Sequence, residues 1–374
     1  MAAVRTDRVS TSPIIIFAGE IEAFGGAERS LLALSRWLTE RKLEHRLLLY
    51  YDDIHLSFFA HHPIDIFTLN PEAQVMHKVG MLQAYFDDLP KDAPRPLMSG
   101  IQAALHASLA GIKGFHTLMH DTPSLLGDGP RAIRSQLRQM IANRMLKRGL
   151  NSGGTTIVTS EYLAAESRKL WHPPVAVARM GGLPAKTFLP RVPATTLRLL
   201  SVSRVEPNKR IDWILAGLAG LEKRRPRLSQ RVDWLLDVVG GGSMIDRLSE
   251  TARKLGLEDR VTFHNFIDDQ HLEAIYDQAD LFLMPARQGY GIPAAEALSR
   301  GIPVLLHRDS GISDILLDTP WATVMEGGEE TMAETLDRAI RSVLSQSHLK
   351  APLPDLPTED GWAEQVARIC GWVS

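Results

Sequence analysis

The sequence predicts an α/β protein built from two doubly wound, Rossmann-like parallel-sheet domains that face each other across a cleft. In both halves of the chain, short apolar runs alternate with amphipathic helical segments, as in parallel sheets covered by helices. Its 374 residues exceed what one hydrophobic core usually serves. Prolines without hydrophobic periodicity at 183–193 separate the halves. We therefore predict a first domain at 1–185, a linker at 186–194, a second domain at 195–355 and a final helix within 356–374.

The composition limits the classes of function. Hydrophobic residues make up 44% and charged residues 23%, and the formal net charge of -2 gives no bulk attraction to nucleic acid. Cys370 is the single cysteine, which excludes an intrachain disulfide and a cysteine-based metal cluster. No apolar run is long enough to cross a bilayer, and residues 1–12 lack the apolar core of a signal peptide. We expect a cytoplasmic protein without a nucleic-acid partner.

The first domain opens with an apolar strand at 13–18 and a loop that contains Gly25 and Gly26. A helix with leucines on one face follows this loop. The glycines fall at the carboxyl end of the strand, where open α/β sheets bind ligands. A tight turn into the helix, with Glu28 placed favourably for the helix dipole, is the structural alternative.

A histidine follows another strand of this domain. The strand is predicted at 115–119 and ends at His120, so the imidazole is expected at the edge of the cleft. The other nearby histidines show no metal-ligand spacing. Further strands are predicted at 45–51, 155–160 and 175–180, whereas 52–92 shows no clear pattern.

Residues 131–150 form the most unbalanced segment, because they carry basic side chains and no acidic one. Apolar residues at helical spacing, among them Leu137, Met140 and Ile141, predict a basic amphipathic helix. Two interpretations stay open for this helix. It packs on its own domain with a solvated basic face, or residues 131–148 lie on an anionic membrane surface.

The second domain begins with a strand at 197–203, and Arg204 and Lys209 flank the end of that strand. An arginine fork and a lysine point charge so placed can neutralise a diphosphate, although such charges are also often only solvated. The next strand, at 232–239, runs into a glycine turn that contains Gly240 and Gly242. The third glycine of a dinucleotide fingerprint is absent, so this turn alone is weak evidence.

Residues 280–304 combine a buried strand, a glycine-rich loop and a helix start. Gly289 and Gly291 permit a tight turn, and Pro293 suits the first helical position. The free amides and the positive end of the helix dipole favour an anion here. Glu296, one turn into the helix, can accept hydrogen bonds from hydroxyl groups of the same ligand. A phosphate beside a diol is the outline of a nucleotide.

These residues resemble the C-terminal signature of family 4 glycosyltransferases, which is a Glu, a Gly-aromatic-Gly turn, and a second Glu eight positions after the first. The turn at 289–291 and Glu296 match this signature, whereas Gln288 stands where the family has its first Glu. The resemblance covers nearly the whole C-terminal half, and in the first half it is limited to isolated motifs.

The resemblance implies the GT-B architecture, with the acceptor on the first domain, the nucleotide sugar on the second, and the final helix packed back on the first. It also implies transfer of a hexosyl unit from a UDP- or GDP-linked sugar to an acceptor hydroxyl, with retention of configuration. Polysaccharide or glycolipid biosynthesis is the setting expected for this reaction. The predicted catalytic residues are His120, Arg204, Lys209 and Gln288, and the predicted donor contacts are Gly25, Gly26, Gly240, Gly242, Gly289, Tyr290, Gly291, Ile292 and Glu296.

Alternatives remain at this point. Another GT-B enzyme, such as a nucleotide-sugar epimerase or a phosphorylase, is one, and a non-catalytic nucleotide-sugar-binding protein is another that Gln288 favours. The chain shows no Asp-x-Asp pair at a strand end, so we expect no divalent metal, and we expect no cofactor. The predicted partners are a nucleotide sugar and a sugar-containing acceptor, in free or lipid-linked form, the latter reached by peripheral contact with the inner membrane surface.

Overall fold

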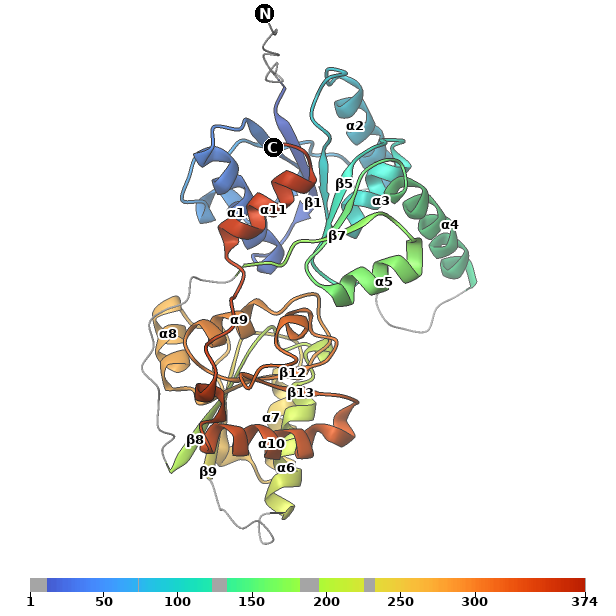
Figure 1. Ribbon diagram of the computed structural model, residues 1–374. Helices are drawn as coiled ribbons and strands as arrows, with labels where there is room; N and C mark the ends of the chain where they lie inside the picture. Colours follow the sequence, from blue (N-terminus) through green and yellow to red (C-terminus); the bar gives the residue numbers. More distant parts are fainter. Residues whose placement is uncertain (1–11, 73, 123–132, 182–194, 225–232, 374) are drawn as a thin grey trace, which may run out of the picture. The chain divides into compact units, whose positions relative to one another are not determined.

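The computed structural model describes residues 12–72, 74–122, 133–181, 195–224 and 233–373 (Figure 1). The chain divides into two compact units, one of residues 1–180 together with 359–374 and the other of residues 181–358. The predicted linker at 186–194 lies outside the described residues.

Unit 1 contains a parallel sheet that has seven strands within the described residues, in the order β3-β2-β1-β4-β5-β6-β7. Its strands are β1 (Ile14–Ile21), β2 (His45–Asp52), β3 (Ile66–Thr68), β4 (Leu97–Ser99), β5 (His116–Met119), β6 (Thr156–Val158) and β7 (Val175–Val177). The central strands form because their apolar runs are buried between helices, as parallel sheets require.

The helices of unit 1 are α1 (Gly26–Glu40), η1 (Leu56–Phe59), α2 (Val75–Asp87), α3 (Ile101–Leu109), α4 (Ile133–Leu150), α5 (Glu161–Trp171) and α11 (Glu359–Ile369). Local signals set some of their ends. The Ser160 hydroxyl accepts a hydrogen bond from the amide of Leu163 at 3.2 Å and caps α5. The segment 52–92, which the sequence left unassigned, contains η1, β3 and α2.

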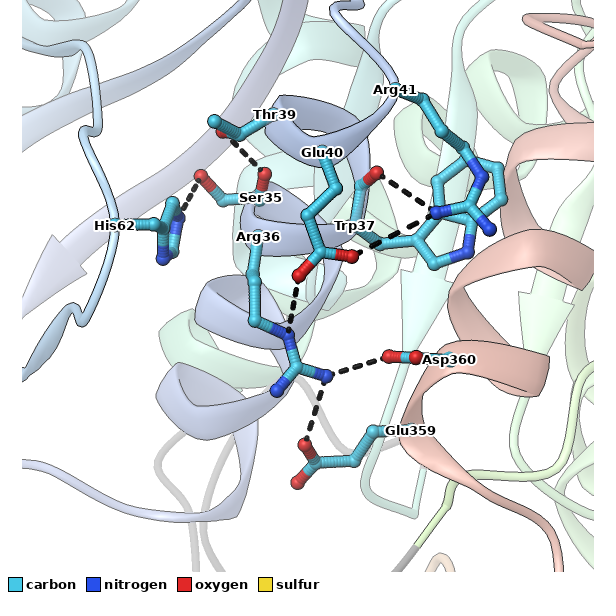
Figure 2. A network of polar contacts seen from close by, with 9 residues as sticks. All are labelled: Ser35, Arg36, Trp37, Thr39, Glu40, Arg41, His62, Glu359 and Asp360. Carbon is cyan, nitrogen blue, oxygen red and sulfur yellow. Dashed lines mark hydrogen bonds and ion pairs between the residues drawn. The ribbon is translucent and has the colours of Figure 1, made fainter.

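The last helix, α11, packs against α1 within unit 1. Figure 2 shows the polar side of this contact, where the Arg36 guanidinium reaches Asp360 at 2.6 Å and Glu359 at 3.6 Å. These groups are partly exposed, so the ion pairs add little free energy. The apolar side contributes more, because Trp362 and Val366 are buried.

Unit 2 contains a parallel sheet in the order β10-β9-β8-β11-β12-β13. Its strands are β8 (Thr196–Val202), β9 (Asp233–Val239), β10 (Val261–Phe263), β11 (Leu281–Met284), β12 (Val304–His307) and β13 (Ala322–Met325). The helical segments described are η2 (Pro207–Lys209), α6 (Ile211–Arg224), α7 (Ile245–Lys254), η4 (Glu258–Arg260), α8 (Asp269–Gln278), α9 (Ile292–Ser299), η5 (Gly311–Ile315), η6 (Glu329–Thr331), α10 (Met332–Leu344) and η7 (Ser347–Lys350).

Both sheets confirm the predicted fold class of two doubly wound parallel-sheet domains. Strand order reverses between β1 and β4 in unit 1 and between β8 and β11 in unit 2. At such a reversal the chain leaves neighbouring strands toward opposite faces, and a crevice opens at their carboxyl ends. Across the described parts of the chain, no helix combines the length and the apolar character needed to span a membrane.

Candidate functional site

The strand reversal of unit 2 gathers the candidate residues of that half. Arg204 and Lys209 follow β8, and Gln288 with the turn at 289–291 follows β11, the neighbouring strand. Lys209 and Gln288 meet, because the Lys209 Nζ donates a hydrogen bond to the Gln288 Oε1 at 3.2 Å. Residues far apart in the sequence therefore come together at the carboxyl edge of the sheet, where such folds bind ligands.

The two basic residues differ in exposure. Lys209 is half-buried and Arg204 is exposed. Glu206 lies between them in sequence, and its carboxylate accepts hydrogen bonds from the Ser243 hydroxyl at 2.6 Å and the Ser243 amide at 3.0 Å. These bonds, first the one from the hydroxyl, hold the pKa of Glu206 below its ordinary value. Glu206 is thus hydrogen-bonded to Ser243, in the loop that follows β9.

The turn before α9 has a fixed shape. Gly291 precedes the helix with φ of +117°, a conformation that L side chains rarely adopt. The amides of Gly311 and Ile312 donate to the carbonyl oxygens of Gln288 and Tyr290, each at 3.0 Å. Within the described residues the amides of Gly291 and Ile292 donate no hydrogen bond, as expected of a first helical turn. Amides in this position can donate hydrogen bonds to an anion, and the predicted donor contact of these residues stays a prediction.

Glu296 lies one turn into α9 and is half-buried. The Tyr276 hydroxyl is 3.4 Å from the Glu296 Oε2 and 3.3 Å from the Pro293 carbonyl oxygen. Tyr276 thereby restricts the carboxylate, which keeps acceptor capacity for the hydroxyl groups of a ligand.

Gln288 uses both ends of its amide. Its oxygen accepts from Lys209, and its Nε2 donates to the Met284 sulfur. This arrangement fixes the side chain without an ionisable group, so Gln288 can position a ligand by hydrogen bonds and cannot act as a base.

Backbone packing explains the need for glycine at two predicted donor contacts. A Cβ at Gly240 would lie 2.0 Å from the carbonyl oxygen of Ser203, and one at Gly242 would lie 2.3 Å from that of Val205. The Val205 amide also donates to the Gly241 carbonyl oxygen at 2.8 Å. These glycines let the loop after β9 support the loop that carries Arg204 and Lys209. Their contact with a donor stays a prediction.

The strand reversal of unit 1 holds a pocket of about 250 Å³. It lies at the carboxyl ends of β1, β4 and β5 and at the start of α1. Glu28 and His120 line it, and the Glu28 Oε2 accepts a hydrogen bond from the Gly25 amide at 2.9 Å. The predicted residues Gly25, Gly26 and His120 thus belong to unit 1, and the other predicted site residues belong to unit 2.

His120 is held beneath this pocket by sulfur and aromatic neighbours. Its Nδ1 is 3.2 Å from the Met180 sulfur, and its ring centroid is 6.3 Å from that of Trp362 on α11. Its buried Nε2 has no hydrogen-bond partner among the residues that the structure describes. Burial lowers the pKa of His120 to about 4, against the opposing charge of Asp121. The imidazole is therefore neutral at pH 7 and can orient a hydroxyl group.

This lowered pKa predicts a measurable effect of pH on stability. Between pH 6.5 and about 4 the unfolded chain binds a proton at His120 that the folded chain does not, so the free energy of unfolding falls as pH falls. His120→Gln should reduce the slope over this range by up to roughly 1.4 kcal/mol per pH unit. Urea unfolding at several pH values measures it, with the exposed His172→Gln as control. Equal slopes for wild type and His120→Gln would contradict the expectation.

Several supporting residues carried no signal in the sequence. Glu206 with Ser243, Tyr276 with Glu296, and the Ser310 hydroxyl with the Tyr290 carbonyl oxygen are pairs distant along the chain. Among the described residues, no group of three or more His, Cys, Asp and Glu side chains has an arrangement that could hold a metal ion.

Comparison with known proteins finds a family match and several relatives. Residues 189–352 match the family model described as glycosyl transferases group 1. A GDP-mannose-dependent alpha-(1-6)-phosphatidylinositol monomannoside mannosyltransferase from Mycolicibacterium smegmatis is 30% identical over 163 residues, which are 41% of this chain and 40% of that protein. A D-inositol 3-phosphate glycosyltransferase from Nocardiopsis dassonvillei is 26% identical over 72% of this chain and 66% of that protein. The chain thus matches less than half the length of the first of these relatives.

Solved structures resemble the whole chain. Anabaena Alr3699/HepE in complex with UDP and glucose has a TM-score of 0.71 at 17% identity, covering 96% of this chain and 100% of that chain. WaaG, a glycosyltransferase involved in lipopolysaccharide biosynthesis, has a TM-score of 0.65 at 17% identity and covers 96% of each chain. At these identities the likeness shows the fold, which is GT-B. The family match confirms the resemblance to family 4 glycosyltransferases.

Proposed function

We propose that this chain, whose residues 189–352 match the group 1 glycosyltransferases, transfers a hexosyl unit from a nucleoside diphosphate sugar to an acceptor hydroxyl with retention of configuration. The observation that carries the proposal is the contact of Lys209 with Gln288 at 3.2 Å, close in sequence to the amides of Gly291 and Ile292 at the start of α9. This places a fixed cation, a hydrogen-bonding amide and a helix N-terminus at one strand reversal.

The unit 2 groups fit a departing diphosphate. Negative charge grows on the diphosphate as its bond to the sugar breaks, and Lys209, Arg204 and the α9 amides stabilise that charge. Glu296 accepts hydrogen bonds from the ribose diol. Because the site already supplies fixed positive groups, the reaction proceeds without a divalent metal.

The sugar is oriented by a neutral side chain, and the acceptor needs no protein base. In unit 2, the Gln288 amide orients the sugar hydroxyls. The acceptor oxygen forms a bond to the anomeric carbon on the face that the diphosphate leaves. The acceptor proton passes to an oxygen of the leaving diphosphate, so charge and atoms balance without a protein base. Retention follows because bond formation and bond cleavage share one face.

A panel of donors tests this function. The named relatives and structural neighbours include a GDP-mannose-dependent enzyme and a complex with UDP and glucose, so both nucleotides belong in the panel. We expect one UDP- or GDP-linked hexose to raise the melting temperature and to release its nucleoside diphosphate slowly, in excess chelator as well as without it. Absence of binding by every donor would overturn the proposal, and turnover that needs added magnesium or manganese would overturn its metal-independent part.

The variant Gln288→Glu distinguishes an enzyme from a non-catalytic nucleotide-sugar-binding protein. In Gln288→Glu the new carboxylate would pair with Lys209 and offset part of the positive charge that acts on the diphosphate. The hydrogen bond that the Gln288 Nε2 donates to the Met284 sulfur would also be lost. We expect kcat/KM for the donor to fall about three- to tenfold, which corresponds to roughly 1 kcal/mol of lost transition-state stabilisation. If the wild type transfers to no acceptor while Gln288→Glu turns over freely, the binder interpretation holds instead.

A second proposal concerns where the reaction occurs. The described part of α4 exposes three large apolar side chains, Leu137 at 56%, Met140 at 63% and Ile141 at 55%. Arg144 and other exposed basic residues continue the same helix. Apolar residues bordered by positive charge fit an anionic bilayer surface. We propose that α4 lies on such a surface, which would give access to a lipid-linked acceptor.

Vesicle binding measures this contact. Because each basic residue near an anionic surface contributes about 1 kcal/mol, reversing Arg144 and Lys147 to Glu should weaken binding to phosphatidylserine-containing vesicles at least about tenfold. Arg168→Glu with Lys169→Glu, on exposed positions of α5 in the same unit, is the matched control. Wild-type binding that is equal for anionic and neutral vesicles would remove the idea.

A further inference from the structure

Three exposed phenylalanines gather after neighbouring strands of unit 1. Phe24 follows β1, and Phe58 and Phe59 follow β2, with exposed fractions of 45%, 82% and 42%. The rings of Phe24 and Phe59 stack, with centroids 4.4 Å apart and planes 13° from parallel. We name these three residues the aromatic platform. The Phe58 ring packs edge-on against His55, with ring centroids 5.6 Å apart. Exposed aromatic surface that is gathered in this way can mark a binding site.

The platform is held in place although its rings face solvent. The Asp52 carboxylate accepts a hydrogen bond from the Leu56 amide at 2.8 Å, and the side chain of Leu56, the first residue of η1, is buried. The Asp53 amide donates to the Ile21 carbonyl oxygen at 3.0 Å, which joins the ends of β1 and β2. Because the turn is fixed, little conformational entropy is lost when a ligand binds to it.

Carboxylates border the aromatic platform. Glu22 and Asp53 are exposed and follow directly after β1 and β2. The Asp53 amide makes the hydrogen bond that joins these strands. This charge disfavours a phosphate or an anionic lipid headgroup, in contrast to the basic surface of α4. Carboxylate oxygens accept hydrogen bonds from hydroxyl groups, and aromatic faces attract the C–H groups of a sugar ring.

The platform lies close in sequence to the pocket of unit 1. The loop that carries Phe24 connects Ile21 to Ala27, and both of these residues line the pocket together with His120. A ligand with several rigid rings could therefore contact the platform and the pocket at once. The three rings are exposed rather than enclosed, whereas a hydrocarbon chain gains most from an enclosed groove.

We propose that the aromatic platform binds a sugar ring of an uncharged glycan acceptor, with Glu22 and Asp53 accepting its hydroxyl groups. This inference rests on the proposed transfer function, because it names the class of acceptor that the first unit takes. Phe58, as the most exposed ring, carries the stacking contact, and the Phe24–Phe59 pair forms the floor beside it.

A binding experiment on the full chain tests the inference. An array of neutral oligosaccharides ending in mannose, glucose, galactose or N-acetylglucosamine is probed with wild type, Phe58→Ala and Phe59→Ala. We expect wild type to bind at least one member and each variant to bind it about tenfold more weakly. Phe67→Ala is the matched control, because Phe67 is 41% exposed on β3 and packs against Tyr85 instead. Glu22→Gln should weaken the same glycan less than the ring variants do.

Nucleotide binding separates this inference from the proposed function. UDP and GDP affinities are measured on every variant and should equal those of wild type. Wild type that binds a nucleotide but no neutral glycan would overturn the inference alone, and so would an equal loss in Phe67→Ala. Tight binding of octyl glycosides with no binding of the methyl glycosides would also overturn it, since the alkyl chain would then be the ligand. Glycan binding without any nucleotide binding would overturn the proposed function.

Discussion

Replacement of Lys209 by alanine is expected to lower kcat for donor cleavage about 100- to 1,000-fold, the usual cost of removing one group that stabilises a developing oxyanion. The Lys209 Nζ is fixed by Gln288 at 3.2 Å, so it meets the leaving group without reorganising. Arg204→Ala should have a smaller effect, because Arg204 is exposed and its charge is screened by water. We expect both variants to lose more kcat than donor affinity, since the charge grows only as the bond breaks.

Steady-state release of nucleoside diphosphate measures this, with Lys223→Ala, an exposed lysine on α6, as the control for loss of one positive charge. Gln288→Ala and the double variant with Lys209→Ala complete a cycle that reports the coupling of the two side chains. Unchanged kcat in Lys209→Ala would remove the leaving-group role. If Lys223→Ala loses as much kcat, the effect comes from the net charge of the protein and not from the position of Lys209.

The fold of the second half could be predicted well from its sequence, because buried strands of a parallel sheet are continuous apolar runs. The runs at β8, β9 and β11 end at Ser203, Gly240 and Pro285, which mark the carboxyl edge. The first half was harder to predict. β3 and β4 have three residues each, too few to show a period, and they become strands only by pairing with β2 and β1.

The candidate site shows the same limit. Arg204, Lys209 and the turn at 289–291 stand beside strand ends, where a sequence pattern can identify them. The contact between Lys209 and Gln288 depends on which strands are neighbours, and that order is not local information. Glycine is ambiguous for a physical reason. A missing Cβ admits a ligand or another backbone equally well, and at Gly240 the structure shows a backbone.

Gly240→Ala is therefore expected to destabilise unit 2 strongly, by about 4 kcal/mol or more, a size reserved for clashes and strained backbone. Two causes act together at this position. Its φ is +128°, outside the range of L residues, and the new Cβ would meet the Ser203 carbonyl oxygen at 2.0 Å. Neither atom is the end of a flexible side chain, so the strain cannot be relieved by a rotamer change.

Two other glycines separate these causes. Gly256 has φ of +69° with open space around it, so Gly256→Ala should cost about 1 kcal/mol from backbone strain alone. At Gly242 the Cβ would lie 2.3 Å from the Val205 carbonyl oxygen without a positive φ to add strain, so Gly242→Ala should cost about 3 kcal/mol. Urea unfolding measures all three, and nucleotide affinity is then measured on the folded fraction. If Gly240→Ala unfolds like wild type but binds no nucleotide, the glycine is required by the ligand, and the account from backbone packing is wrong.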